Sequence, residues 1–226
     1  MNTAIIVAAG SGSRFAASQP KQFVELLGKP LIIHTIERFQ ACAAIDEIVL
    51  VLSEEGRNEF ARLRAQFEIS KLKSVILGGK TRAESVRNAL DAVDASTATI
   101  VAVHDGARPL VTIDEISRVV EKATETGAAC LVAEVTDTIK EIEGEYISRT
   151  IDRRTLRRAL TPQAFRYEVL RRAFSGVHLD ESVTDECYLV EKLGVKIAFV
   201  EGSSANIKVT RTEDLILAKA LSEPPA

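Results

Sequence analysis

Short apolar runs rich in β-branched residues alternate with amphipathic stretches along this chain, and that alternation most constrains its fold. The runs cover residues 4–9, 47–52, 74–77, 99–104, 128–135 and 196–200. They are nearly all apolar and do not alternate in polarity, a pattern typical of strands that are covered on both faces, as in parallel sheets. We therefore predict a mostly parallel sheet built from these runs.

Amphipathic helices are predicted between the runs. Apolar residues recur at helical spacing at positions 83, 86, 89, 90 and 93, and again at 113, 116, 119, 120 and 123. Thr81, Thr112 and Thr210 each stand three residues before a Glu, the spacing of the capping box at helix N-termini. Together these patterns predict an open, mostly parallel, Rossmann-like α/β sheet with helices on both faces.

One segment breaks this rhythm. Residues 138–151 carry apolar side chains at every second or third position around the sequence Glu143-Gly144-Glu145. This pattern predicts a two-stranded β-hairpin arm over about 137–152, inserted into a single domain that spans residues 1–226. Because a lone hairpin is marginally stable in water, we expect the arm to pack against a second subunit.

Charge and composition exclude several classes of protein. The net charge is −3, whereas domains that bind nucleic acid carry a basic excess, so we expect no polynucleotide partner. No apolar run approaches the ~18 residues that cross a membrane, and nothing at the N-terminus resembles a signal peptide. Cys42, Cys130 and Cys187 are odd in number and far apart, as expected of small buried side chains in a reducing compartment. We therefore expect a cytoplasmic protein.

A glycine-containing loop, Gly10-Ser11-Gly12-Ser13-Arg14, follows the first predicted strand. Open α/β sheets bind ligands at the carboxyl ends of their strands, and loop amides form concavities for anions. Phe15 stands where the dinucleotide fingerprint needs a third glycine, and residues 15–17 lack the G-K-[ST] of the P-loop. Arg14 and Lys21 flank a stretch suited to a triphosphate, although they would also be compatible with two solvated surface cations.

Polar clusters follow two later strands. Gly78 and Gly79 precede a capped helix, which suits close approach to an anion or a base edge, or an ordinary tight turn. Asp105 ends the fourth strand, where a carboxylate beside phosphates is a good ligand for Mg²⁺; the alternative is an Asp that stabilises a turn.

Two basic segments complete the set. Arg154, Arg157 and Arg158 recur at helical spacing, so part of the arginine-rich segment 153–158 is predicted to be a solvated helix face. Lys208 stands in an apolar run, which is costly unless it faces a partner anion or reaches the solvent from an edge strand.

These motifs occur in an order that resembles one enzyme family. They are A-A-G-S-G-S-R, P-K-Q-F, G-G-K-T-R-A-E-S-V, V-H-D-G-A-R-P, D-R-R-T-L-R-R-A-L-T-P-Q, T-D-E and N-I-K-V-T. From residue 4 to about residue 220 the chain resembles the 2-C-methyl-D-erythritol 4-phosphate cytidylyltransferases of the non-mevalonate isoprenoid pathway. The resemblance implies that CTP and the polyol phosphate give a CDP-alcohol and diphosphate, with Mg²⁺ or another divalent cation.

The resemblance also implies roles for residues of this chain. The cations that act on the α-phosphate would be Arg14 and Lys21. The CTP cradle would contain Ala8, Ala9, Gly10, Gly12, Gly79, Arg82, Ser85, Asp105 and Gly106. Arg153 and Lys208 would position the methylerythritol phosphate, with further contacts from Arg108, Thr138, Thr161 and Thr184. The arm would embrace a second subunit, so that Arg153 and Thr161 serve the partner's site in a homodimer.

Two other functions remain open at this point. A ribitol-5-phosphate cytidylyltransferase shares the glycine loop, P-K-Q-F and N-I-K, but the acceptor-side segment D-R-x-x-L-x-x-A-x-T-P-Q and the Gly106-Ala107 pair favour the methylerythritol enzymes. A non-catalytic nucleotide sensor on the same fold would be expected to lack at least one of Arg14, Lys21, Asp105, Arg153 and Lys208. Because the chain ends near the close of this domain, we also expect no fused cyclase of the later pathway.

Overall fold

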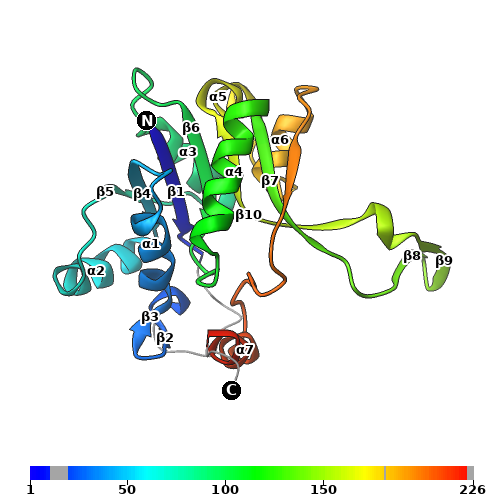
Figure 1. Cartoon of the computed structure of the whole chain (residues 1–226), viewed down its shortest axis with the longest axis horizontal. Coiled ribbons are helices and arrows are strands. Elements are labelled where there is room, and N and C mark those ends of the chain that lie inside the picture. The colour runs from blue at the N-terminus through cyan, green and yellow to red at the C-terminus, as the bar shows by residue number, and fades with distance from the viewer. Residues whose placement is uncertain (11–19, 181, 223–226) are drawn as a thin grey trace.

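A seven-stranded sheet forms the centre of the molecule (Figure 1). The computed structural model describes residues 1–10, 20–180 and 182–222. The strand order is β11-β7-β10-β6-β1-β4-β5, and all neighbours are parallel except that β10 runs antiparallel to both β6 and β7. The strands are β1 (Asn2–Ala8), β4 (Glu47–Leu52), β5 (Leu72–Leu77), β6 (Ile100–Asp105), β7 (Ala128–Glu134), β10 (Arg157–Arg166) and β11 (Ala198–Glu201). The prediction of an open, mostly parallel α/β sheet is confirmed.

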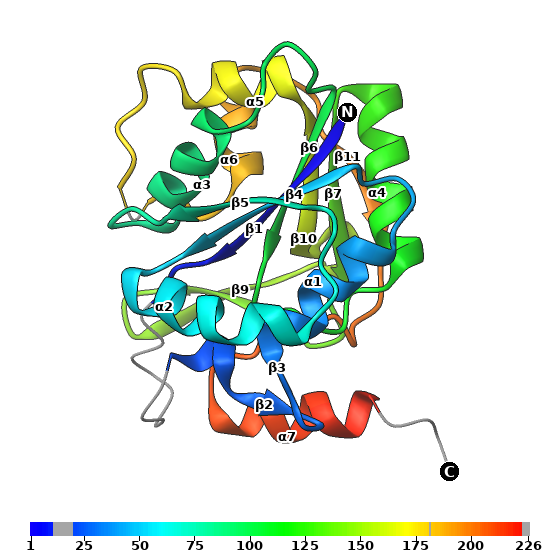
Figure 2. The ribbon, with the colours of Figure 1, turned by 90° about the vertical axis from the view of Figure 1, so that its left-hand side faces the viewer.

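Helices cover both faces of this sheet (Figure 2). One face carries α1 (Leu31–Ala41), α2 (Glu54–Leu63) and α4 (Ile113–Thr126); the other carries α3 (Arg82–Asp91), α5 (Tyr167–Phe174) and α6 (Glu186–Glu191). Successive strand residues face opposite ways, so Ile5 packs in the second layer and Ile6 in the first. Burial on both faces explains why the strand sequences are almost wholly apolar.

Two of the three expected capping boxes are confirmed. The hydroxyls of Thr81 and Thr112 accept hydrogen bonds from the backbone N–H groups three residues later, and the Glu side chains accept in return. The third capping box is wrong, because Thr210 pairs with Asp214 and not with Glu213. Helix α7 (Thr212–Ser222) begins two residues after Thr210, and the carboxylate of Asp214 accepts hydrogen bonds from the backbone N–H and the hydroxyl of Thr210, both at 2.7 Å.

The arginine-rich segment folds differently from our prediction. Residues Arg153–Thr155 form a 3₁₀ turn (η3), and Arg157 and Arg158 begin strand β10. Backbone pairing with β7, where Arg157 lies opposite Glu134, decides the conformation here. Pairing with the neighbouring strand therefore overrides the helix that the spacing of only three arginines had predicted.

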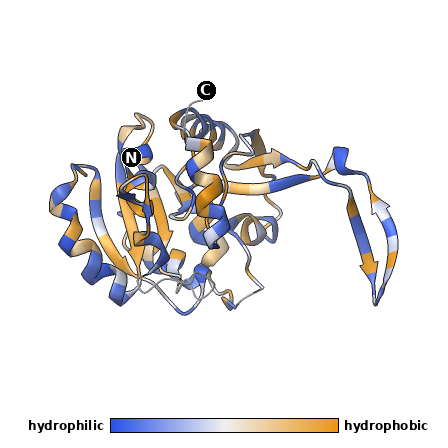
Figure 3. Ribbon diagram, turned by 90° about the horizontal axis from the view of Figure 1, so that it is seen from below, coloured by the Kyte–Doolittle hydropathy of each residue, from blue (hydrophilic) through white to orange (hydrophobic). Residues whose placement is uncertain are grey.

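The predicted hairpin arm is present. It consists of β8 (Ile139–Glu143) and β9 (Tyr146–Ile151), which pair antiparallel and project away from the sheet (Figures 1 and 3). Ile142, Tyr146 and Ile147 are exposed on it. Side chains of this kind are normally covered, so the arm carries an apolar surface that the described residues of its own chain leave open.

Short elements lie beside the carboxyl ends of the strands (Figure 1). They are η1 (Lys21–Phe23), β2 (Glu25–Leu26) and β3 (Lys29–Pro30), whereas η2 (Arg64–Gln66) directly follows α2. A small apolar cluster of Leu26, Leu31, Val209 and Ala218 joins β2, α1 and α7. This cluster fixes the segment before α7 beside the end of β6.

The three cysteines are buried and free, as expected. Among the described residues, none of the helices has the length and apolar character needed to cross a membrane.

Candidate active site

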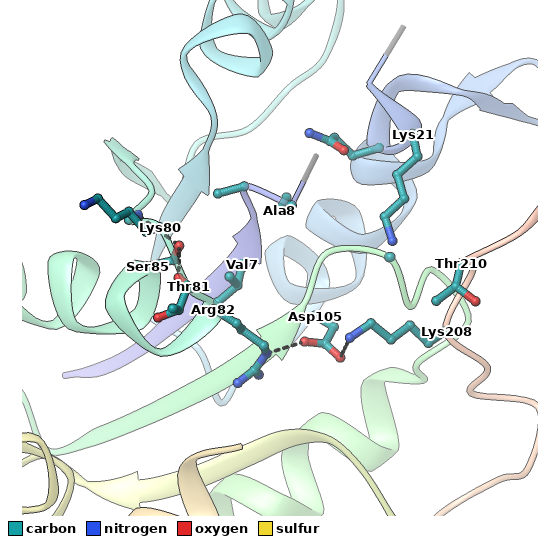
Figure 4. Close-up of a pocket in the computed structure, with 15 residues that line it drawn as sticks. Val7, Ala8, Lys21, Lys80, Thr81, Arg82, Ser85, Asp105, Lys208 and Thr210 are labelled. Atoms are coloured by element: carbon teal, nitrogen blue, oxygen red, sulfur yellow. Dashed lines mark hydrogen bonds and ion pairs between the residues drawn. The ribbon is translucent and has the colours of Figure 1, made fainter. Parts of the chain in front are cut away.

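A pocket of about 450 Å³ opens at the carboxyl ends of β1 and β6. The chain order reverses between these strands, since β4 and β5 lie on one side of β1 and β6 lies on the other. Open α/β sheets bind ligands at such a switch point. The lining residues are Val7, Ala8, Ala9, Gly10, Lys21, Gln22, Gly79, Lys80, Thr81, Arg82, Ser85, Asp105, Ala107, Lys208 and Thr210 (Figure 4).

Most residues proposed for the CTP site meet in this pocket. They are Ala8, Ala9, Gly10, Gly79, Arg82, Ser85 and Asp105; Lys21, assigned to the α-phosphate, and Lys208, assigned to the acceptor, line the same pocket. Gly12 and Arg14 lie outside the described residues.

Gly79 lies where the loop after β5 turns into α3. A Cβ there would stand 2.4 Å from the Cβ of Glu84, so no other residue fits without a shift. The N–H of Gly79 donates to the hydroxyl of Ser85 at 3.1 Å, and that hydroxyl donates to the carbonyl of Thr81 at 2.9 Å. This wall of the pocket is therefore held by hydrogen bonds within the loop and the first turn of the helix.

Gly106 brings the ends of β1 and β6 together below the pocket. Its N–H donates to the carbonyl of Val7 at 2.8 Å, and a Cβ would stand 2.7 Å from Ile32 and 2.8 Å from Ala8. Gly106 is buried and does not line the pocket itself. The close approach that it permits places Asp105 beside the loop after β1.

Three cations surround the carboxylate of Asp105, and Figure 4 shows two of them, Arg82 and Lys208. Its Oδ1 accepts from Nε of Arg82 at 3.0 Å, and its Oδ2 lies 3.0 Å from Nζ of Lys208 and 3.4 Å from Nε of Arg108. Burial alone would raise the pKa of Asp105, but these three cations hold that pKa well below its usual range. Lys208 thus faces an anion, which is the first of the two alternatives that its apolar sequence context left open.

Lys21 points into the pocket from η1 (Figure 4). Its Nζ donates to the carbonyl of Val209 at 3.3 Å, and the N–H of Val209 donates to the carbonyl of Ala107 at 2.8 Å. The chain segment between Lys208 and Thr210 is therefore tied to both η1 and the end of β6. Two lysines that are 187 positions apart in the sequence consequently border the same cavity.

Thr161 lies beneath the carboxylate cluster. Its hydroxyl accepts from the N–H of Asp105 at 3.1 Å and contacts Nδ1 of His104 at 3.0 Å. Its carbonyl accepts from the side-chain amide of Asn206 at 2.9 Å, and the carbonyl of Asn206 accepts from Arg108 at 2.8 Å. Thr161 is thus used within its own chain, where it fixes the backbone of Asp105.

Glu186 is a site residue that our sequence reasoning missed. It is 1% exposed, and its two carboxylate oxygens accept from Nη1 and Nη2 of Arg82 at 2.6 and 3.1 Å. Burial raises the pKa of Glu186, while Arg82 opposes that shift. The only sequence signal was its place in the T-D-E motif.

The charges in this cluster do not cancel. Arg82, Arg108 and Lys208 face the two carboxylates of Asp105 and Glu186, which leaves one positive charge in excess. The lysines at positions 21 and 80 add to it at the pocket wall. An excess of cations around a cavity of this size favours a polyanionic ligand.

Comparison with known proteins agrees with this geometry. The family model described as 2-C-methyl-D-erythritol 4-phosphate cytidylyltransferase matches residues 2–223. The chain belongs to this family. The curated enzymes of that name from Bacillus velezensis and Syntrophus aciditrophicus are 43% and 40% identical, each over 96% of this chain and 94% of the relative. The resemblance inferred from the ordered motifs is confirmed.

Solved structures of the same enzyme family share the fold. A 4-diphosphocytidyl-2C-methyl-D-erythritol synthase from Anaerococcus prevotii superposes with a TM-score of 0.85 at 26% identity, covering 99% of this chain and 96% of that one. The 2-C-methyl-D-erythritol 4-phosphate cytidylyltransferase from Thermus thermophilus gives 0.76 at 32% identity, covering 98% and 99%.

Several residues that the family resemblance assigns to the acceptor lie away from the pocket lining. Thr138, just before β8, and Arg153, in η3 just after β9, are both exposed at the base of the arm, where Arg153 donates to the carbonyl of Thr136. Thr184 is exposed just before α6. None of these three residues lines the pocket with Lys208, and Arg108 reaches its edge only through its contact with Asp105.

The donor set at Asp105 suits one kind of metal ion. No group of three or more His, Cys, Asp or Glu that could hold a metal occurs in the described part of the chain. Mg²⁺ is commonly held by one or two carboxylates together with substrate phosphates, and the ionised carboxylate of Asp105 beside the pocket fits that role.

Proposed function

We infer that this protein transfers the cytidylyl group of CTP to 2-C-methyl-D-erythritol 4-phosphate, giving 4-diphosphocytidyl-2-C-methyl-D-erythritol and diphosphate for isoprenoid biosynthesis. The family match over residues 2–223 supports the reaction. The observation that carries it is the gathering of Lys21, Arg82, Lys208 and Asp105 in one pocket at the switch point of the sheet, with Arg82 and Lys208 paired to Asp105. A nucleoside triphosphate and a second phosphate are the ligands that such a cavity would take.

CTP is proposed to lie along the β1 and β5 sides of the pocket. The backbone at Ala8, Ala9 and Gly10 would border the nucleotide on one side, and the wall at Gly79 and Ser85, held in shape by its own hydrogen bonds, would border it on the other. Gly12 and Arg14 extend this cradle in the proposal, as the family resemblance implies. Gly106 serves it indirectly, because it allows the two strand ends to approach.

The chemistry needs positioning and charge stabilisation. An ionised phosphate oxygen of the acceptor attacks the α-phosphorus of CTP, a new P–O bond forms, and the bond to the diphosphate leaving group breaks. The nucleophile is already ionised, so no general base is required, and no histidine occurs among the described residues that line the pocket. Lys21 and Arg14 are proposed to stabilise the charge that develops at the α-phosphate and the leaving diphosphate.

A divalent cation is proposed to assist. Asp105 is the residue that would hold it, together with phosphate oxygens of CTP. Such an ion would offset the repulsion between the two anionic substrates. Arg82 and Arg108 orient the carboxylate on the protein side.

The acceptor is proposed to bind between two subunits. Lys208, Arg108 and Thr184 would contact it from one subunit, and Arg153 and Thr138 would reach it from the arm of the other. The exposed apolar side chains on the arm support a homodimer, because they need a surface to cover them. Thr161 is assigned to its own chain's site, since its hydroxyl holds the N–H of Asp105.

We also propose that the enzyme works in the cytoplasm. Its three buried, free thiols are compatible with a reducing compartment.

Diphosphate release tests the acceptor assignment. CTP and Mg²⁺ are supplied with methylerythritol phosphate or with ribitol 5-phosphate in parallel reactions. A strong preference for methylerythritol phosphate is expected. A preference for ribitol 5-phosphate would retain the CTP site and overturn the acceptor assignment, and no turnover with either would support a nucleotide sensor.

Complementation tests the shared site. Lys21→Ala and Arg153→Ala are each expected to be impaired alone. In a mixed dimer, one site would contain both substitutions and the other neither, so random re-pairing should restore about a quarter of the wild-type activity. If mixing restores nothing while native mass spectrometry shows mixed dimers, Arg153 acts within its own chain.

A further inference from the structure

Glu186 is a buried carboxylate that none of the proposed roles uses. It is the first residue of α6, and its position is fixed from β10. Gln163 donates from its side-chain amide to Asp185 at 2.9 Å and accepts from the N–H of Cys187 at 3.1 Å. Gln163 therefore clamps both neighbours of Glu186, which leaves its carboxylate little freedom.

The carboxylate of Glu186 holds Arg82 in a forked pair. Both terminal nitrogens of the guanidinium donate to Glu186, at 2.6 and 3.1 Å, while its Nε donates to Asp105 at 3.0 Å. A guanidinium is planar, so contacts on two of its edges fix both its position and its plane. Burial alone would lower the pKa of Arg82, but the two carboxylates raise it.

Such a pair is a costly way to stabilise a fold. The free energy lost by taking two charges out of water offsets much of their mutual attraction, and apolar residues of similar size often stabilise a fold equally well. Glu186 and the side chain of Arg82 are 1% and 24% exposed, so the pair lies at the inner edge of the pocket with one face of Arg82 still accessible. This position suggests a role in the site.

We propose that Glu186 is a positioning residue, which fixes Arg82 and through it the Oδ1 side of Asp105 for binding CTP. The inference rests on the proposed placement of CTP beside Arg82 and Asp105. The effect should be selective, because the Oδ2 side of Asp105 is held independently by Lys208 and Arg108. Loss of the Glu186 carboxylate therefore disturbs the nucleotide side of the pocket and leaves the acceptor side in place.

Glu186→Gln tests this with little change of shape. The amide places a donor against a nitrogen of Arg82 that is itself a donor, so one of the two hydrogen bonds is lost. We expect kcat/KM for CTP to fall about 10–100-fold, the range for residues that orient a ligand-binding group. The KM for methylerythritol phosphate should stay within about twofold of wild type. Calorimetric binding of CTP without acceptor should weaken by a similar factor.

Glu115→Gln provides a matched control. Glu115 is a buried glutamate in the first turn of α4, where it accepts from the N–H groups of Thr112 and Ser203 at 2.8 and 2.6 Å. It does not line the pocket. Its substitution should lower the melting temperature and leave the affinity for CTP unchanged.

The outcomes separate this inference from the proposed function. If Glu186→Gln lowers only the melting temperature, as Glu115→Gln does, Glu186 is merely structural. If Arg82→Gln also leaves CTP binding intact, the placement of CTP is wrong as well; if Arg82→Gln weakens it and Glu186→Gln does not, only the inference fails. Should Glu186→Gln not fold, Glu186→Asp keeps the charge but is too short for the fork, and the same selective loss is expected.

Discussion

Asp105→Asn should destabilise the protein even in the absence of substrates. The substitution keeps the shape of the side chain and removes the charge that faces Arg82, Arg108 and Lys208 at 3.0, 3.4 and 3.0 Å. Two of these cations would still have another way to compensate their charge. Arg82 keeps its pair with Glu186, and the side chain of Lys208 is 39% exposed and can turn toward water. Arg108, at 12%, would be left beside a neutral amide.

The magnitude follows from this inventory. Removing one partner of a buried ion pair costs about 3–5 kcal/mol when the other charge stays uncompensated. Since only Arg108 is left without another carboxylate or access to water, and it keeps its hydrogen bond to the carbonyl of Asn206, we expect a loss of about 2–3 kcal/mol in the free energy of unfolding, somewhat below that range. For a chain of this length the melting temperature should fall by about 5–10 °C.

The pH dependence provides a second test. The folded-state pKa of Asp105 is depressed, so its contribution to stability is fully present above the unfolded pKa of about 3.9 and is lost as pH falls below that value. The difference between wild type and Asp105→Asn should therefore be constant near neutral pH and should shrink in acid.

Urea unfolding in EDTA, without CTP, measures both quantities. Asp91→Asn is the control, because Asp91 is an exposed carboxylate that pairs with Arg171 on the surface, and its loss should cost less than about 1 kcal/mol. Equal stability of Asp105→Asn and wild type at neutral pH, or a difference that does not shrink in acid, would refute the charge argument.

Three further predictions concern other parts of the site. Lys21→Ala should lower kcat about 10²–10³-fold, the cost of one donor to a transition state, and a near-wild-type kcat in steady-state assays would show that Lys21 has another role. Arg153→Ala should raise the KM for methylerythritol phosphate and leave that for CTP unchanged; a selective rise in the KM for CTP would contradict its assignment. Asp214→Ala removes the acceptor for Thr210 and the N–H of Arg211, so thermal unfolding should show a loss of about 1 kcal/mol. Burial would raise the pKa of Asp214 but these hydrogen bonds lower it, so that loss should diminish in acid, and an equal loss at all pH values would exclude the carboxylate as its cause.

The parallel strands could be predicted because burial on both faces makes their sequences almost wholly apolar. Residues such as Ile5 and Ile6 are buried against opposite helical layers, so both must be apolar. The sequence of strand β10 has no continuous apolar run of this kind. It begins with Arg157 and Arg158 at the solvent end and contains Pro162, where its register with β7 shifts. Its pairing with β6 and β7 depends on partners more than 20 residues away in the chain.

The candidate site was predictable to the extent that it follows strand ends. Asp105 directly ends a buried strand and Gly79 directly precedes a capped helix, so local sequence places both. The pairing of Arg82 with Glu186 spans 104 positions, and a glutamate at the start of a short helix has no local feature that marks it as buried. Spacing alone also could not show that Thr161 serves the backbone of its own chain's Asp105.

The cations around Asp105 differ in how readily they can leave it for a substrate. Arg82 is fixed by Glu186, and Arg108 also donates to the carbonyl of Asn206 at 2.8 Å and is the least exposed of the three. Lys208 has the most exposed side chain and contacts the carboxylate through a single flexible ammonium. When an acceptor phosphate enters, we therefore expect Lys208 to turn toward it at the lowest cost, while the two arginines keep the carboxylate oriented and ionised. Under the proposed roles, this difference would let one carboxylate organise the nucleotide side of the pocket and still release a cation to the acceptor.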